Sequence, residues 1–149
     1  MKRTLIKNLS QHKTESVAIN GWIDVARNQG KMAFFDFRDT TGKVQGVVFG
    51  KPEVLEVAKT LRPEWVVAVT GIVNERPEKM VKEGIINGDI EIEITDIKVL
   101  NTAETPAFEI TESTADINEE VRLKNRYLDL RTERMQHNMK MRHKVAKLC

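Results

Sequence analysis

The segment of residues 21–49, GWIDVARNQGKMAFFDFRDTTGKVQGVVF, constrains the fold of this chain more than any other stretch. With the residues just before it, it contains three runs that have the two-residue alternation of half-buried strands. Apolar side chains set the alternation of the first run: Val17, Ile19, Ile23 and Val25. Glycine and small polar residues at 28–30 and 40–42 suit sharp reversals. We therefore expect three consecutive strands joined by two tight turns.

The middle strand, residues 32–38, carries an aromatic side chain on each face. Phe35 lies on one face, whereas Phe34 shares the other face with Asp36 and Arg38. Because the two charged residues mark this second face as solvent-exposed, Phe34 is predicted to stand on a polar sheet surface.

The third strand places an amide on the same predicted surface. Gln45 alternates with Val44 and Gly46, so its side chain is expected to point outward beside Phe34. An exposed aromatic ring next to an amide and nearby arginines is typical of proteins that read single-stranded nucleic acid.

The remaining elements complete a recognisable order. Pro52 in the first turn begins a helix that ends before Pro63. Residues 65–73 form a strongly β-forming run, and residues 89–94 alternate until the parity changes, which predicts a bulge near Thr95. Three strands, a helix and two strands match the OB-fold, a mainly β, five-stranded Greek-key barrel. We expect this barrel within residues 1–101.

The C-terminal part has a different character. Residues 102–118 contain no Lys or Arg and predict an acidic linker. Residues 119–149 predict a helical hinge, capped by Asp116 or Asn118. A second helix there carries an apolar stripe that is expected to pack in a core: Met135, Met139, Val145 and Leu148. The pattern stops at Cys149 without a helix cap, so we expect the chain to be a fragment of a longer protein.

Composition excludes several classes of protein. With 40% hydrophobic and 31% charged residues and no apolar run of about 20 residues, the chain is predicted to be soluble and not membrane-bound. A single cysteine excludes a disulfide framework and favours the cytoplasm. Three scattered histidines predict no metal site and are expected on the surface. The net charge of +2 does not itself indicate nucleic acid, and the basic segment after residue 121 fits either a solvated helix face or a tail near phosphate.

Three stretches resemble a known family. GWIDVARNQGKMAFFDFRD followed by GKVQ is similar to the anticodon-binding barrel of class II aminoacyl-tRNA synthetases of the aspartate–asparagine–lysine subgroup. VTGIVNERPEKMVKEGIINGDIEIEI resembles the end of that barrel. EEVRLKNRYLDLRTERMQHNMKMRHKV resembles the hinge and first catalytic-domain helices, and its RYLDLR is the most specific indication of the bacterial aspartyl enzymes.

The resemblance implies an aspartate–tRNA ligase whose N-terminal domain reads the tRNA anticodon. The family's ATP and magnesium sites and most of its homodimer contacts lie in a catalytic domain beyond residue 149, so this chain alone is expected to hold no cofactor and to be inactive. Two alternatives stay open: a free-standing OB-fold module that binds single strands, and an asparaginyl or relaxed-specificity synthetase.

The resemblance also assigns roles to individual residues. It implies that Phe34 stacks on the middle anticodon base, a uracil, and that Gln45 hydrogen-bonds the edge of this base. Glu91 is implied to accept hydrogen bonds from the first base, a guanine or its derivative, with Arg76 in the loop that approaches the same nucleotide. Arg27 is implied to contact the anticodon backbone or the third base.

Strand parity supports most of these positions. It predicts Phe34, Gln45 and Glu91 as exposed, but it places Arg27 on the face of buried Val25 unless a bulge intervenes. Packing of Phe34 under the 77–87 loop, and solvated strand positions for Gln45 and Glu91, remain as structural alternatives. Gln29 lies near the implied site of the third base, where its role is open.

Two further residues, Arg38 and Asp39, are expected to form a structural ion pair at the second turn.

Overall fold

The computed structural model describes residues 2–82, 84–110, 114 and 116–148. It divides into two compact units, Met1–Thr105 and Pro106–Cys149, which are described separately. The predicted linker of residues 102–118 spans this boundary, and its residues 111–113 and 115 lie outside the described residues, as does Cys149.

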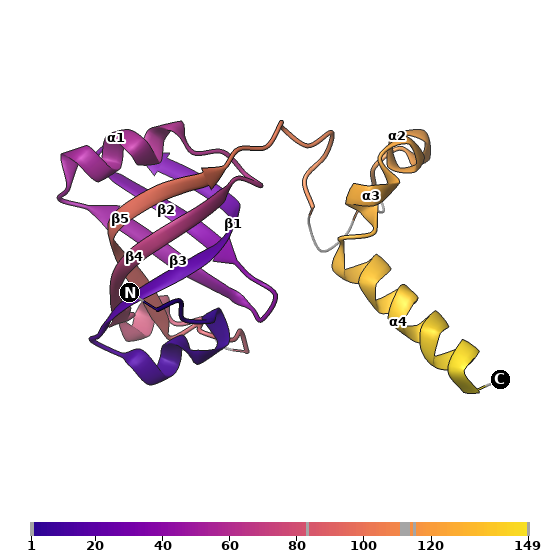
Figure 1. The fold of residues 1–149 in the computed structure, drawn as a ribbon, viewed down its shortest axis with the longest axis horizontal. Coiled ribbons are helices and arrows are strands. Elements are labelled where there is room, and N and C mark those ends of the chain that lie inside the picture. Colours follow the sequence, from indigo (N-terminus) through magenta and orange to yellow (C-terminus); the bar gives the residue numbers. More distant parts are fainter. Residues whose placement is uncertain (1, 83, 111–113, 115, 149) are drawn as a thin grey trace. The chain divides into compact units, whose positions relative to one another are not determined.

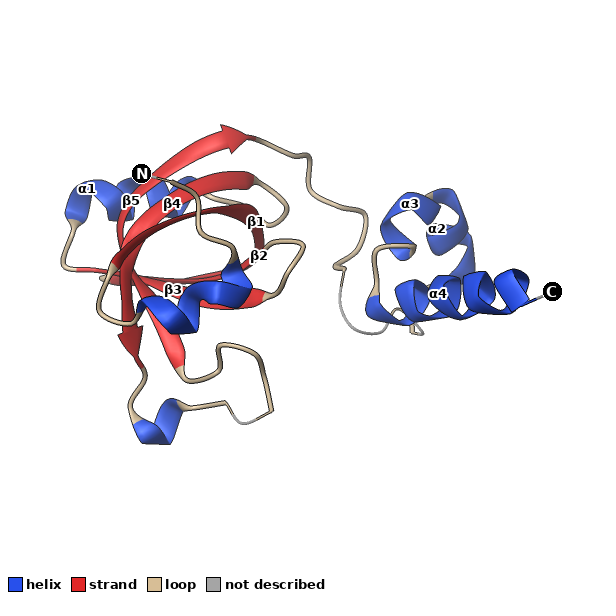
Figure 2. Ribbon diagram, turned by 60° about the horizontal axis from the view of Figure 1, so that its bottom comes forward, coloured by secondary structure: helices blue, strands red, loops and turns tan. Residues whose placement is uncertain are grey.

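The first unit is a closed five-stranded barrel (Figures 1 and 2). Its elements are β1 (Ser16–Gln29), β2 (Met32–Arg38), β3 (Lys43–Phe49), α1 (Pro52–Thr60), β4 (Val66–Glu75) and β5 (Ile90–Asn101). Around the barrel the strands follow the order β1-β2-β3-β5-β4, and β4 pairs back with β1. Only the β3–β5 pairing is parallel among these strands. The predicted OB-fold, with its helix between the third and fourth strands, is confirmed.

Inward-facing side chains from every strand fill the barrel. The largest buried ones include Phe35 and Phe37, whose rings stack with centroids 5.7 Å apart. Gly46 leaves the room they need, because a Cβ at this position would lie 2.7 Å from the Phe37 ring and 2.9 Å from Ile94. Fully burying a side chain as large as Phe stabilises a fold by about 1.5–3 kcal/mol.

A bulge at Asp24 reverses the parity of β1. Ile23 lies opposite Phe37 and Val25 lies opposite Asp36, so Asp24 has no partner residue on β2. The inward position predicted for Val25 is therefore wrong: its side chain is 37% exposed. A second bulge, predicted near Thr95, is confirmed, since Ile94 pairs with Gly71 and Asp96 pairs with Thr70.

A short 3-10 helix, η1 (Ile6–His12), buries Ile6 and Leu9 against the barrel. Asp39 connects this helix to the β2–β3 turn. Its Oδ2 accepts from the Ile6 N–H (3.0 Å), and its Oδ1 accepts from the Thr41 N–H (2.6 Å), the Thr41 hydroxyl (2.6 Å) and the Gly42 N–H (3.2 Å). Burial alone would raise the pKa of Asp39, but these hydrogen bonds outweigh it and hold the pKa below its ordinary value.

The predicted ion pair between Arg38 and Asp39 is wrong, because Arg38 has other partners. Arg38 instead contacts Asp24 (2.9 Å) and Glu64 (2.7 Å) and lies 6.0 Å from the centroid of the Trp22 ring. Arg38 therefore has the structural role that was expected, but it stabilises the β1 bulge and not the turn.

The second unit contains α2 (Glu119–Lys124), α3 (Arg126–Asp129) and α4 (Glu133–Leu148). Asn118 caps α2 by accepting from the Glu120 N–H at 2.8 Å, as one of the two expected caps. Buried Asp129 accepts from the Thr114 hydroxyl (2.7 Å) and from Arg126 (2.8 Å), which fixes the turn before α4.

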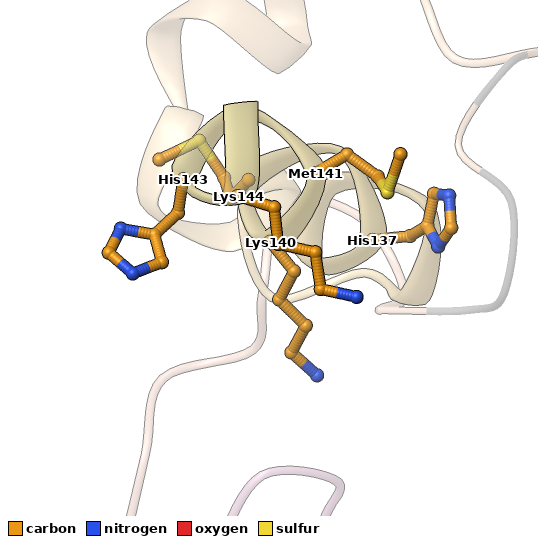
Figure 3. Close-up of a pocket in the computed structure, with 6 residues that line it drawn as sticks. His137, Lys140, Met141, His143 and Lys144 are labelled. Atoms are coloured by element: carbon orange, nitrogen blue, oxygen red, sulfur yellow. The ribbon is translucent and has the colours of Figure 1, made fainter. Parts of the chain in front are cut away.

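The core position predicted for the stripe on α4 holds for Met135 alone. Met139, Val145 and Leu148 are exposed. The side chains that line a pocket on α4 all come from this helix, and His137 and His143 point in different directions from it (Figure 3). No helix among the described residues is long and apolar enough to cross a membrane.

Candidate nucleic-acid interface

The strand registers bring distant residues together in rows across the outside of the barrel. One row of Cα partners runs across all five strands: Val25, Asp36, Gln45, Glu91 and Asn74. The next row is formed by Arg27, Phe34, Val47 and Glu93. We call these two rows the outer face. Of the five site residues predicted from sequence, it contains four: Arg27, Phe34, Gln45 and Glu91.

The two adjacent phenylalanines of β2 lie on opposite sides of the sheet. Phe35 is fully buried in the barrel, whereas Phe34 is partly exposed on the outer face. Phe34 lies between Arg27 on β1 and Val47 on β3. Val47 also points outward but is only 7% exposed, so neighbouring side chains cover it. Phe34 thus has an apolar cross-strand neighbour, and part of its own surface is open to solvent.

Arg27 points outward because the Asp24 bulge shifts the strand. Its guanidinium Nη2 lies 3.1 Å from Oδ2 of Asp36, and its side chain is 48% exposed. Strand parity alone predicted an inward side chain for Arg27, whereas its implied role requires an outward one. The bulge removes this conflict.

Gln45 is placed between two carboxylates, since its Cα partners are Asp36 and Glu91. Its side chain is half-buried and makes no hydrogen bond within the described part of the chain. The amide therefore has a donor and an acceptor available for a ligand.

Arg76 follows β4 directly and lies beside Glu91. The Arg76 Nε is 3.8 Å from Glu91 Oε2, and the Arg76 side chain is only 5% exposed, against 24% for Glu91. The Arg76 Nε is buried and has no hydrogen-bond partner among the described residues. Of this pair, Glu91 offers its carboxylate to solvent and Arg76 supports it electrostatically from the interior.

The loop between β4 and β5 is fixed at its base. The Asn87 amide donates to the carbonyls of Ile6 (3.0 Å) and Lys43 (3.4 Å). Lys13 contacts both ends of the loop, Glu75 at 2.8 Å and Asp89 at 3.1 Å. The hydrogen bonds to Glu75 and Asp89 raise the pKa of Lys13, and the hydrogen bond from Lys13 lowers the pKa of Asp89.

The same loop exposes apolar side chains. It contains the short 3-10 helix η2 (Glu78–Met80), and its exposed apolar residues are Met80, Val81, Ile85 and Ile86. These four side chains leave apolar surface of the loop open to solvent.

Sequence reasoning missed the partners of the acidic residues on the outer face. Asp36 pairs with Arg27, and Glu93 accepts a hydrogen bond from the Asn74 amide at 3.1 Å. Alternation predicted the outward direction of Asp36, but these pairings depend on the barrel register. Among the described residues, no group of three His, Cys, Asp or Glu side chains is placed to hold a metal ion.

Comparison with known proteins agrees with this geometry. The sequence model of the OB-fold nucleic acid binding domain (tRNA_anti-codon) matches residues 17–100. Among curated proteins, the chain is 46% identical over 136 residues to the aspartate–tRNA(Asp/Asn) ligase of Natranaerobius thermophilus, covering 90% of this chain and 23% of that protein. It is 40% identical to the aspartate–tRNA ligase of Staphylococcus aureus, covering 89% of this chain and 23% of that protein.

Solved structures show the same relationship. The asparaginyl-tRNA synthetase of Pyrococcus horikoshii matches with a TM-score of 0.72 and 28% identity over 94% of this chain and 31% of the other. The aspartyl tRNA synthetase of Entamoeba histolytica matches with a TM-score of 0.75 and 25% identity over 89% of this chain and 33% of the other. The chain spans about a quarter of the length of the curated relatives it matches. By its fold, its outer face and this sequence match, the chain belongs to the family of OB-fold nucleic acid binding domains.

Proposed function

We propose that the outer face binds the anticodon loop of a tRNA for aspartate. The observation that carries this proposal is the row of Cα partners that sets Gln45 between Asp36 and Glu91, next to the row that contains Phe34 and Arg27. The rows bring an aromatic ring, an amide, a carboxylate and a cation to one surface, and proteins that bind single-stranded RNA use such groups for stacking, base edges and phosphate.

The assignment of bases follows from chemistry. Phe34 stacks on the middle base, a uracil, whose edge matches the unengaged amide of Gln45. Glu91 accepts from the first base, because guanine presents two donors on its pairing edge. Arg27 contacts the backbone or the third base. Arg76 acts on the first base through Glu91, beside which it is buried.

We propose further that the whole protein is an aspartate–tRNA ligase. It would join aspartate to tRNA through an aspartyl-adenylate with ATP and magnesium, as a cytoplasmic homodimer, in a catalytic domain outside these 149 residues. The support for this proposal is the identity of 46% and 40% to two ligases over about nine-tenths of the chain. The first of these relatives is named for both aspartate and asparagine tRNAs, so relaxed specificity is the second candidate.

Binding of short RNA stem-loops to the 149-residue chain tests the anticodon proposal. A stem-loop with the anticodon GUC should bind about tenfold more tightly than the same stem-loop with the middle base changed to C, since one bidentate base contact contributes about 1–3 kcal/mol of discrimination. Both affinities should fall as salt is added. Equal binding of both loops would contradict the proposal and favour a module that binds any single strand.

Charging assays on the whole protein test the wider proposal. Aspartate should be attached to tRNA with the anticodon GUC in an ATP-dependent reaction. Attachment of aspartate to tRNA with the asparagine anticodon GUU as well would establish relaxed specificity, and attachment of asparagine instead would contradict the proposal.

A further inference from the structure

Phe49, the last residue of β3, is the most exposed aromatic side chain of the described barrel, at 61%. The register of β2 and β3 continues without a shift from Arg38 opposite Lys43 to Met32 opposite Phe49. Phe49 therefore points to the same side as Gln45 and Val47, which is the outer face. A single exposed apolar residue is ordinary on a protein surface, so the exposure of Phe49 alone does not indicate a binding site.

The location of Phe49 extends the outer face by a third row. Gln29 on β1 pairs with Met32 on β2, and Met32 pairs with Phe49 on β3. This row follows directly after the row of Arg27, Phe34 and Val47. Phe49 is thus a diagonal cross-strand neighbour of Phe34, and such neighbours have Cα atoms about 7–8 Å apart. Adjacent nucleotides of an unstacked strand can bridge two rings at this spacing.

Two lysines lie close in sequence to the third row. Lys31 precedes Met32 in the β1–β2 turn, and Lys51 follows Phe49 by two residues. Within the described ranges neither lysine has an ion-pair partner, whereas Asp36 and Glu91 on the first row are each paired with an arginine, and Glu93 on the second row accepts a hydrogen bond from the Asn74 amide. The third row therefore combines an exposed ring with uncompensated cations, the combination that binds single-stranded nucleic acid through stacking and phosphate contacts.

We propose that Phe49 forms a second stacking position, which holds the nucleotide adjacent to the one on Phe34. This inference rests on the proposed binding of an anticodon loop at the outer face and adds one nucleotide to the length of RNA that the barrel engages.

The test uses Phe49→Leu, which keeps an apolar side chain and removes the ring. Stem-loops with the anticodon GUC, each with the fluorescent base 2-aminopurine at a different loop position, are titrated with the wild-type chain and the variant. Phe49→Leu should bind at least threefold more weakly, and the fluorescence of one loop position should rise because its base loses the stacking partner. Phe49→Tyr should restore both properties. Leu100→Ala, at a similarly exposed apolar site on β5, is the matched control and should bind like wild type.

Unchanged affinity and fluorescence at every position in Phe49→Leu would overturn the inference. Weaker binding without a position-specific fluorescence change would overturn it too, because Phe49 would then act other than by stacking. The failure of the anticodon proposal gives a different result: Phe34→Ala would also bind like wild type, and the loop sequence would not matter.

Discussion

Arg27 and Asp36 form an ion pair on the outer face, with the Arg27 Nη2 3.1 Å from Asp36 Oδ2. The pair exists because the bulge at Asp24 turns Arg27 outward beside Phe34. The side chains are 48% and 23% exposed, and a pair of this kind contributes at most about 1 kcal/mol to stability. Its consequence is therefore electrostatic: it compensates and orients the cation nearest the stacking ring.

Replacing Asp36 by Asn should reduce the discrimination between RNA loops more than it reduces stability. An uncompensated Arg27 would bind phosphate in any sequence, so mismatched loops should bind several-fold more tightly. The plot of log affinity against log salt should become steeper by about 0.7–0.9, the value for one additional phosphate contact. Asp96→Asn, at an exposed acid on β5 outside the rows of the outer face, should change neither property. An unaltered salt slope in Asp36→Asn would show that Asp36 does not restrain Arg27.

Replacing Gln45 by Ala should remove the preference at the middle anticodon base. The variant should lose about 1–3 kcal/mol of binding free energy for the GUC stem-loop, and almost none for a stem-loop with another middle base. Paired titrations of both loops measure the difference. Gln11→Ala, at an exposed glutamine on η1, is the control. If the Gln45 variant keeps the wild-type preference, another residue reads this base.

Asp39 should make the stability of the barrel depend on pH. Its pKa is lowered in the folded protein, so its contribution is present above the ordinary carboxyl pKa of about 4 and is lost as the pH falls through the folded value. Asp39→Asn should lower the free energy of unfolding at pH 7 by about 1–3 kcal/mol, because hydrogen bonds to a charged acceptor are lost. The difference between wild type and variant should shrink below about pH 4 in denaturant melts. A difference that stays constant with pH would contradict the role of the carboxylate.

The 149-residue chain should form no aspartyl-adenylate from aspartate and ATP. The physical reason is that the chain corresponds to 23% of its curated relatives, and the described part consists of a nucleic-acid-binding barrel and a short helical unit. Exchange of labelled pyrophosphate into ATP is the measurement, with the whole protein as the positive control. Exchange above background with the 149-residue chain would contradict the proposal that catalysis takes place in a separate domain.

Local patterns predicted the barrel well because they report alternation and turn chemistry directly. The faces of Phe34 and Phe35, the position of α1 and the bulge at Thr95 all follow from such patterns. The bulge at Asp24 does not, since the residues around it contain no local signature. The Asp24 carboxylate contacts Arg38 and Lys43, both at 2.9 Å, and these partners come from β2 and β3.

The other features that the sequence did not predict also depend on contacts between residues that are distant in sequence. Helical spacing shows that Met139 and Val145 share a stripe with Met135, but it does not show what covers that stripe. The burial of Arg76 behind Glu91 and the pairing of Gln45 with Glu91 depend on β5 lying parallel to β3. Contacts between strands that are distant in sequence determine these features, and no window of neighbouring residues contains them.

The central claim is that Phe34 and Phe35, on opposite faces of β2, have different roles: Phe34 binds RNA and Phe35 stabilises the core. Phe34→Ala should fold nearly as well as wild type but bind the GUC stem-loop at least tenfold more weakly, or about 1.4 kcal/mol, within the range of about 1–3 kcal/mol for a stacked base. Phe35→Ala should lose about 3–5 kcal/mol of stability and melt at a markedly lower temperature with or without RNA.

Denaturant melts and stem-loop titrations of Phe34→Ala and Phe35→Ala, made side by side, are the most direct measurement. The account predicts a binding defect without a folding defect for the first variant and a folding defect for the second. A Phe34→Ala chain that folds normally and binds the GUC stem-loop like wild type would contradict it.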